Sequence, residues 1–183
     1  MGVELDFLNF IQENLRTSIG DAVIPTITQT MNYDILAGVI AVILICTKRF
    51  RWIGFAILIG AVLGYLIGNG MIKFLVDRPR PFIENSNIIL LIPAPTSSSF
   101  PSGHTIGAVA MAVVLYMYNK KAGYIGFIFA AIIAFSRLYL YVHYPTDVIA
   151  GIVIGIICGY VGYRISELIR IRYKKEKVEE DVV

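Results

Sequence analysis

Apolar residues along this chain gather into five long runs that short polar segments separate. The runs span Tyr33–Thr47, Trp52–Ile72, His104–Tyr118, Ala122–Ser136 and Val148–Tyr163. A helix needs about 20 mostly apolar residues to cross a bilayer. The second run is long enough by itself, whereas the other four need flanking residues. The pattern predicts an all-α protein, a polytopic transmembrane helical bundle of about five spans.

The N-terminal segment has a different pattern. Between residues 3 and 16, apolar side chains recur at helical spacing on one face, namely Phe7, Leu8, Ile11 and Leu15. Polar side chains occupy the opposite face. This predicts an amphipathic helix that lies on the bilayer surface and does not cross it. A sixth span within residues 3–30 is the alternative.

Two of the apolar runs carry a glycine at every fourth position. The glycines are Gly60, Gly64 and Gly68 in the second run and Gly151, Gly155 and Gly159 in the fifth. Small residues at this spacing let helix backbones approach closely, either within one chain or across a dimer. We favour packing within the chain, and we expect the second and fifth runs to pack together. No oligomer is indicated.

Composition agrees with a membrane protein. Of the 183 residues, 57% are hydrophobic and only 16% are charged, whereas soluble domains carry about a quarter charged residues. The length suits one membrane-embedded domain over residues 1–183, with an interfacial helix region at 1–30 and a charged tail at 164–183. The net charge of +3 is too small to indicate nucleic-acid binding. The expected partners are membrane lipids.

The distribution of positive charge predicts an orientation. Lysines and arginines gather in the 48–51 segment, at 120–121 and in the tail after residue 164. The positive-inside rule places these segments in the cytoplasm. Five spans in the plasma membrane then give a cytoplasmic C-terminus and leave the remaining polar clusters on the extracytoplasmic face.

Three polar clusters lie at that predicted outer face. They are Lys73-x6-Arg80-Pro81, Pro101-Ser102-Gly103-His104 and Ser136-Arg137-x5-His143-x3-Asp147. Cations in an apolar setting are costly unless an anion meets them. Arginine offers forked donors and lysine a point charge, so Lys73, Arg80 and Arg137 are suited to surround a phosphate group.

The other residues of these clusters suggest how a phosphate would react. Ser102 and Gly103 precede an apolar helix, whose free N–H groups can bind an anion, and Ser102 can cap that helix or donate to a phosphoryl oxygen. Asp147 can fix the tautomer of His143 and leave the other ring nitrogen free to attack phosphorus. His104 is then the general acid for the leaving oxygen.

Two further questions concern metal ions and a second phosphate. A histidine and aspartate cluster can bind a metal, but the neighbours here are cations and not further carboxylates. We therefore expect no metal and no cofactor.

Arg78 is the candidate for a second phosphate group, and the alternative is a surface cation balanced by Asp77 or Glu84.

The three clusters together resemble the signature motifs of the type-2 phosphatidic acid phosphatase superfamily. The match is complete at the motif residues, has the same order, and covers about residues 70–150. The resemblance implies a metal-independent membrane phosphatase that works through a phosphohistidine. His143 would be the nucleophile, Asp147 its partner and His104 the acid. The phosphoryl group would be bound by Lys73, Arg80, Arg137, Ser102 and Gly103.

The short length and compact loops look most like members that act on undecaprenyl and other polyprenyl diphosphates. Phosphatidic acid and phosphatidylglycerophosphate are alternative substrates. The same motifs bind vanadate in haloperoxidases, but those proteins are soluble and larger. A membrane anion transporter or scaffold is the alternative from another class, and it would need the cations but neither His104 nor His143.

Overall fold

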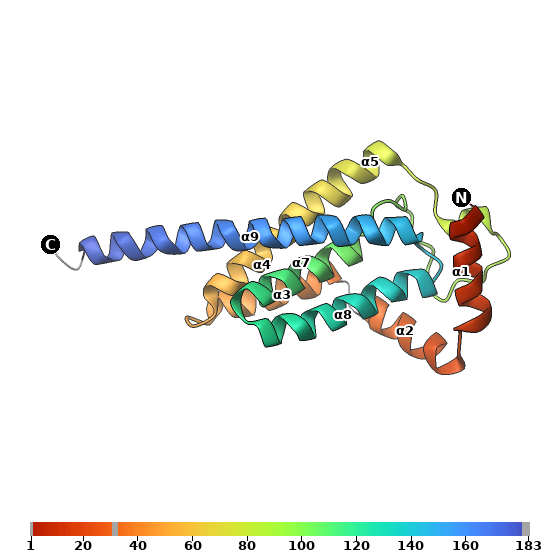
Figure 1. Cartoon of the computed structure of the whole chain (residues 1–183), viewed down its shortest axis with the longest axis horizontal. Coiled ribbons are helices and arrows are strands. Elements are labelled where there is room, and N and C mark those ends of the chain that lie inside the picture. Colours follow the sequence, from red (N-terminus) through yellow and green to blue (C-terminus); the bar gives the residue numbers. More distant parts are fainter. Residues whose placement is uncertain (1, 31–32, 181–183) are drawn as a thin grey trace.

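The computed structural model describes residues 2–30 and 33–180, and every regular element in that part of the chain is helical (Figure 1). The elements are α1 (Gly2–Asn14), α2 (Ser18–Thr30), α3 (Tyr33–Cys46), α4 (Arg51–Gly64), the π-helical segment η1 (Tyr65–Ile72), α5 (Lys73–Val76), α6 (Pro81–Glu84), α7 (Gly103–Tyr118), α8 (Lys120–Tyr139) and α9 (Pro145–Glu180). The predicted all-α class is confirmed.

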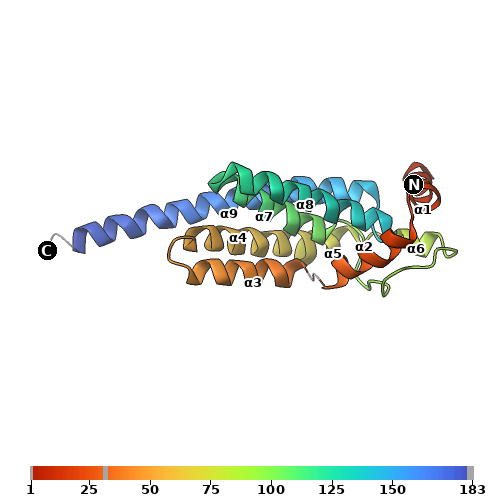
Figure 2. The same cartoon turned by 90° about the horizontal axis from the view of Figure 1, so that it is seen from below.

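Helix α7 forms the centre of the bundle, with α8, α9, α4 and α3 packed around it (Figures 1 and 2). Its sequence is apolar on all sides, which is typical of a helix buried by its neighbours. Small side chains such as Ala108 and Ala112 are almost fully buried, and the larger Ile133 of α8 packs against them. The alternation of small and large residues lets the helices approach closely.

All five predicted apolar runs are helical. Within the described residues, three continuous helical stretches are long and apolar enough to cross a membrane: Arg51–Glu84, Lys120–Tyr139 and Pro145–Glu179. The apolar stretches Leu36–Cys46 and Gly103–Tyr118 are shorter. The protein is therefore a membrane-spanning bundle, built from long helices that enclose a shorter central one.

The glycine repeats lie in close contacts within the chain. A Cβ on Gly159 would lie 2.5 Å from the carbonyl oxygen of Ala110, and one on Gly155 would lie 2.8 Å from that of Ile106. On the facing side, Gly60 of α4 lies against the backbone of α9 at Cys158. The expected packing of the second run against the fifth is confirmed. Glycine is required at 155 and 159, where the backbone of α9 almost touches that of α7.

Helix α1 lies across the end of the bundle where α8 ends and α9 begins (Figures 1 and 2). Leu8 and Ile11 are fully buried, and Leu8 packs with Tyr141 and Tyr144. These two residues are therefore buried within the protein and do not meet the bilayer as the predicted surface helix required; for Leu8 the reason is that the aromatic α8–α9 connection offers it an apolar surface of the protein itself. Phe7 remains exposed.

Two further elements differ from the expectations. Residues 18–30 form helix α2, which contains Pro25 and has 13 residues, fewer than a spanning helix needs. The charged tail at 164–183 is largely a continuation of α9, which remains helical to Glu180 and projects far beyond the other helices (Figure 1).

Candidate active site

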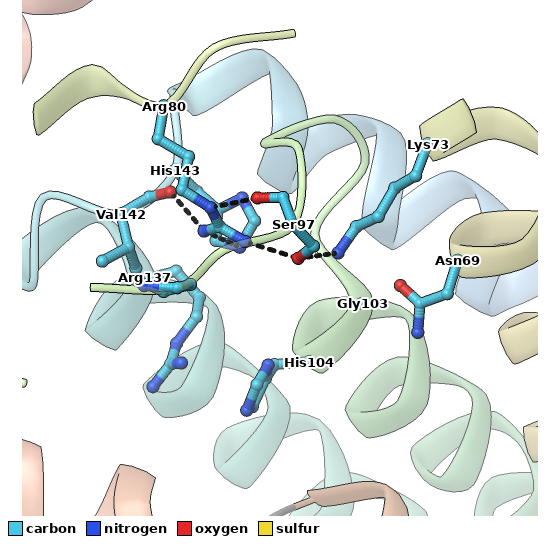
Figure 3. Close-up of a pocket in the computed structure, with 10 residues that line it drawn as sticks. Asn69, Lys73, Arg80, Ser97, Gly103, His104, Arg137, Val142 and His143 are labelled. Carbon is cyan, nitrogen blue, oxygen red and sulfur yellow. Dashed lines mark hydrogen bonds between the residues drawn. The ribbon is translucent and has the colours of Figure 1, made fainter. Parts of the chain in front are cut away.

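The three polar clusters meet around one cavity at the end of the bundle that α1 crosses (Figure 3). The cavity has a volume of about 160 Å³ and is lined by Asn69, Lys73, Arg80, Pro95, Ser97, Gly103, His104, Arg137, Val142 and His143. Five different segments supply these residues: the η1–α5 helix, the connection from α5 to α7, the start of α7, the last turn of α8 and the α8–α9 connection.

Arg80 donates hydrogen bonds from all three of its guanidinium nitrogens. It lies just before α6 and is 4% exposed. Its Nε donates to the carbonyl oxygen of Ser97 at 2.7 Å, and its Nη1 donates to that of Val142 at 2.8 Å. Its Nη2 and the Nζ of Lys73 both donate to Ser97 Oγ, at 3.1 and 3.4 Å. Ser97 therefore holds two cations beside each other at the cavity wall.

Arg137 approaches the cavity from the last turn of α8. It is 2% exposed. Its side chain donates to the hydroxyl of Ser136 at 3.1 Å and to that of Thr28 on α2. These partners are neutral, so the guanidinium charge remains available to an anion in the cavity. Helix α2 therefore contributes directly to the position of a cavity residue.

His143 presents its two ring nitrogens to different partners. Nδ1 lies 3.4 Å from Asp147 Oδ2, and Nε2 lies 3.4 Å from Arg80 Nη1. This buried Nδ1 atom has no hydrogen-bond partner among the described residues. Such contacts are often long in unliganded enzymes and tighten when substrate binds. The arrangement suits a neutral ring with a proton on Nδ1 and a lone pair on Nε2.

Asp147 is itself held by several donors. It is fully buried in the first turn of α9. Its Oδ2 accepts hydrogen bonds from the hydroxyl of Ser99 and from the backbone N–H of Tyr144, the latter at 2.9 Å. Its Oδ1 accepts one from Arg78 Nη1 at 2.7 Å. The carboxylate is thus fixed beside the imidazole before any ligand arrives.

The short connection between α8 and α9 turns the chain so that His143 and Arg137 face the same cavity. Tyr141 adopts a left-handed conformation with φ of 58°, which is unfavourable for a residue with a side chain. Its ring is fully buried, and its hydroxyl donates to Asn9 of α1 at 2.7 Å. Packing against α1 stabilises the strained turn.

The environment keeps His143 uncharged near neutral pH. Burial lowers the pKa of His143 to about 4; the nearby Asp147 opposes this change, and Arg80 adds to it. A neutral imidazole is the form that can act as a nucleophile. Because the ring is neutral, the positive charge of the three cations at the cavity is available to bind an anion.

The second cluster forms the start of α7. Gly103 and His104 line the cavity, and a Cβ on Gly103 would lie 2.9 Å from Asn69 Oδ1. Ser102 is fully buried, and its side chain makes no capping hydrogen bond. Its Oγ accepts from Thr105 Oγ1 at 2.9 Å. The expected capping role is therefore wrong, because Thr105 engages this hydroxyl instead.

Arg78 binds carboxylates, but they are not those of Asp77 and Glu84, the two that its sequence neighbourhood suggests. Its Nη1 donates to Asp147, and its Nη2 forms a 2.6 Å ion pair with Glu4 Oε2 of α1. The guanidinium carbon lies 3.7 Å from the centre of the Tyr144 ring. Asp77 and Glu84 are not the partners because α1 brings Glu4 closer. Arg78 does not line the cavity of Figure 3.

Several residues of the site were not identified from the sequence, among them Pro95 and Val142 of the cavity lining. Those with polar side chains include Thr28, Asn69, Ser97 and Ser99. Ser97 and Ser99 belong to the run Thr96-Ser97-Ser98-Ser99, a cluster of hydroxyls that could have drawn attention. Asn69 lies one helical turn before Lys73 and points into the cavity (Figure 3); its Oδ1 is buried with no hydrogen-bond partner among the described residues.

Comparisons with known proteins identify relatives of this chain. Undecaprenyl-diphosphatase BcrC of Bacillus subtilis (strain 168) is 36% identical over 123 residues, which cover 67% of this chain and 61% of that protein. An undecaprenyl-diphosphatase of Sulfolobus acidocaldarius is 35% identical over 128 residues, 69% of this chain and 62% of that protein. The chain thus spans about three fifths of the length of these curated relatives.

Solved structures share the fold. The crystal structure of LpxE from Aquifex aeolicus superposes with a TM-score of 0.77 and 27% identity, over 88% of this chain and 95% of that one. A phosphatidylglycerolphosphate phosphatase from Bacillus subtilis superposes with a TM-score of 0.74 over 92% of this chain and 86% of that one; at 22% identity it supports the fold alone. The family model of the PAP2 superfamily matches residues 49–170, which include all three clusters. The chain therefore belongs to the PAP2 superfamily, the one that its motifs resemble.

Proposed function

We propose that this protein is an integral-membrane phosphatase that hydrolyses a polyprenyl diphosphate, best represented by undecaprenyl diphosphate, to the monophosphate. The observation that carries the proposal is the single cavity that brings three cations together with both histidines of the chain. The cations match a phosphate group, and the histidines supply a nucleophile and an acid. An anion carrier would need only the cations.

In the proposed mechanism, Lys73, Arg80 and Arg137 bind the terminal phosphoryl group, and the N–H groups at Gly103 add donors. The Nε2 lone pair of His143 attacks phosphorus as the bond to the bridging oxygen breaks. His104 gives its proton to that oxygen, and the lipid monophosphate leaves. A water molecule then attacks phosphorus and passes a proton to His104 while the P–N bond to His143 breaks, and inorganic phosphate is released.

The choice of substrate follows the relatives. The two curated relatives described above are named undecaprenyl-diphosphatases. Two other relatives are named lipid A phosphatases, and these names also describe the removal of a phosphate attached to a lipid. Phosphatidic acid and phosphatidylglycerophosphate remain the alternative substrates, and they share the same phosphoryl chemistry.

Phosphate release from the purified protein in detergent tests this function. We expect release from undecaprenyl diphosphate to exceed that from phosphatidic acid and phosphatidylglycerophosphate.

Activity should persist in excess EDTA, because the cavity is lined by cations and a phosphohistidine route needs no divalent metal. Vanadate should inhibit, since bound vanadate can adopt the trigonal-bipyramidal geometry of the transition state for phosphoryl transfer. Complete loss of activity in EDTA that magnesium restores would contradict the mechanism.

We also propose that the protein resides in the plasma membrane with its cavity on the extracytoplasmic face and its C-terminus in the cytoplasm. The α3–α4 loop, the α7–α8 loop and the end of α9 lie at the end of the molecule opposite the cavity (Figures 1 and 2). These segments carry Lys48, Arg49, Lys120, Lys121 and the basic tail. Their shared position agrees with the positive-inside rule.

Cysteine labelling tests this orientation. In a background that lacks Cys46 and Cys158, Asn87→Cys should react with an impermeant thiol reagent in intact cells, and Lys175→Cys should react only after lysis. Both positions are exposed. Asn87 is chosen because it lies outside the cavity lining, so that the change leaves the site intact. The opposite labelling pattern would show that the cavity faces the cytoplasm.

A further inference from the structure

Helix α1 brings a carboxylate to the back of the site, outside the region that the family model matches. Glu4 Oε2 lies 2.6 Å from Arg78 Nη2, and Arg78 Nη1 lies 2.7 Å from Asp147 Oδ1. We propose that Glu4 is a positioning residue that acts through Arg78 to set the orientation and charge of Asp147, and so the basicity of His143. This inference rests on the proposed function, in which His143 is the nucleophile.

Glu4 is anchored by more than one contact. Its Oε1 accepts hydrogen bonds from the backbone N–H of Thr146 at 3.1 Å and from Thr146 Oγ1 at 2.7 Å. Thr146 is the residue before Asp147 in the first turn of α9. The carboxylate therefore holds both Arg78 and the backbone beside Asp147, and it interacts favourably with the N-terminal end of a long helix.

The rest of α1 is docked closely enough to hold this carboxylate in place. Gln12 Nε2 donates to the carbonyl oxygen of Tyr139 at 2.9 Å, and Asn9 Oδ1 accepts from the Tyr141 hydroxyl at 2.7 Å. Leu8 is fully buried. These contacts fix α1 along the same α8–α9 connection that carries His143. A helix bound only to lipid would not hold a side chain at hydrogen-bond distance.

The charges explain why this position matters. Arg78 and His143 both face the carboxylate of Asp147, so the cation competes with an imidazolium for the same negative charge. Glu4 takes part of the Arg78 charge and leaves more of the Asp147 charge for His143. Burial by itself would raise the pKa of Glu4. The hydrogen bonds from Thr146 and Arg78 lower it by a larger amount, so the pKa of Glu4 is below its usual value. Glu4 is thus ionised at neutral pH.

The test compares Glu4→Gln with Asp6→Asn. Both changes remove one negative charge from α1, but Asp6 is exposed. With undecaprenyl diphosphate, Glu4→Gln should lower kcat about tenfold, as expected for the loss of one charge-assisted hydrogen bond, with KM within about twofold. Asp6→Asn should change neither. Adding Glu4→Gln to Arg78→Gln should have an effect of less than about twofold, because Arg78 transmits the influence of Glu4.

A second readout does not depend on turnover. The chain has two histidines, so their ring ¹⁵N signals can be followed by NMR in detergent and assigned with His104→Ala. Glu4→Gln should move the titration of His143 to lower pH, since the removed negative charge no longer favours the imidazolium. The other charged and titratable groups around His143 are unchanged: Asp147 from α9, Arg80, Lys73 and, across the cavity, His104.

The outcomes separate this inference from the proposed function. An unchanged His143 titration in Glu4→Gln, or a shift equal to that in Asp6→Asn, would overturn the positioning role even in a fully active enzyme. The titration midpoint does not depend on the folded fraction, so a less stable variant still gives an answer. Failure of the wild-type protein to release phosphate would instead contradict the proposed function and leave the predicted shift to stand or fall on the NMR result.

Discussion

Replacement of His143 by alanine should abolish release of phosphate from undecaprenyl diphosphate. In the proposed mechanism its Nε2 forms the covalent bond between the protein and phosphorus, and alanine offers no substitute. Within the described chain, the other imidazole is that of His104, which lines the opposite side of the cavity on α7. The measurement is steady-state phosphate release with purified variants, and the expected rate is that of the uncatalysed background.

The variant His104→Ala is the matched control. Loss of a general acid should slow turnover by roughly 10²–10⁴-fold. p-Nitrophenyl phosphate should partly rescue His104→Ala because its leaving oxygen needs little protonation, and it should not rescue His143→Ala. Binding of phosphate should survive both changes, since the three cations remain. Rescue of His143→Ala to the level of His104→Ala would show that the two histidines have the opposite roles.

The change Asp147→Asn should reduce kcat by about 10³–10⁴-fold with either substrate, by analogy with the orienting aspartate of a catalytic triad. The carboxylate accepts hydrogen bonds from Arg78, Ser99 and the Tyr144 N–H. The amide NH₂ of asparagine is itself a donor, so it would face one of these donors and could not accept its hydrogen bond. The imidazole would lose the partner that fixes its tautomer. Kinetics with undecaprenyl diphosphate and p-nitrophenyl phosphate measure the effect.

The variant Ser99→Ala provides a graded comparison. It removes one of the donors to Asp147 Oδ2 and keeps the carboxylate charge. We expect a loss of kcat on the order of tenfold, as for one hydrogen bond to a charged group. If Asp147→Asn were no more impaired than Ser99→Ala, then the charge of Asp147 would not act on His143, and the proposed pairing would be wrong.

Within the fold, local patterns predicted the elements whose neighbours are apolar. The runs that became α3, α4, α7, α8 and α9 are read from hydrophobicity alone, because a bilayer requires apolar side chains on every exposed face. Glycine spacing indicated the contact of α4 with α9, since only small residues allow backbones to approach closely. These features depend on residues that are near one another in sequence.

The N-terminal part did not follow from local pattern. Phe7, Leu8 and Ile11 look alike on a helical face, but only Leu8 and Ile11 are buried. The burial of Leu8 depends on the aromatic surface of Tyr141 and Tyr144, more than 130 residues away in the chain. Helix α2 was missed for a related reason, since its proline and its short length give no clear signal.

By itself, the sequence determined the class of protein and identified the three polar clusters that meet at one cavity. Motif spacing named Lys73, Arg80, His104, Arg137 and His143 because cations and histidines are rare and costly in apolar surroundings. Only the tertiary structure decided how they are supported: Ser97 beside two cations, Ser99 on Asp147, and Glu4 on Arg78. Such supports are ordinary polar residues in sequence, and they become identifiable only when folding brings distant segments within hydrogen-bond distance.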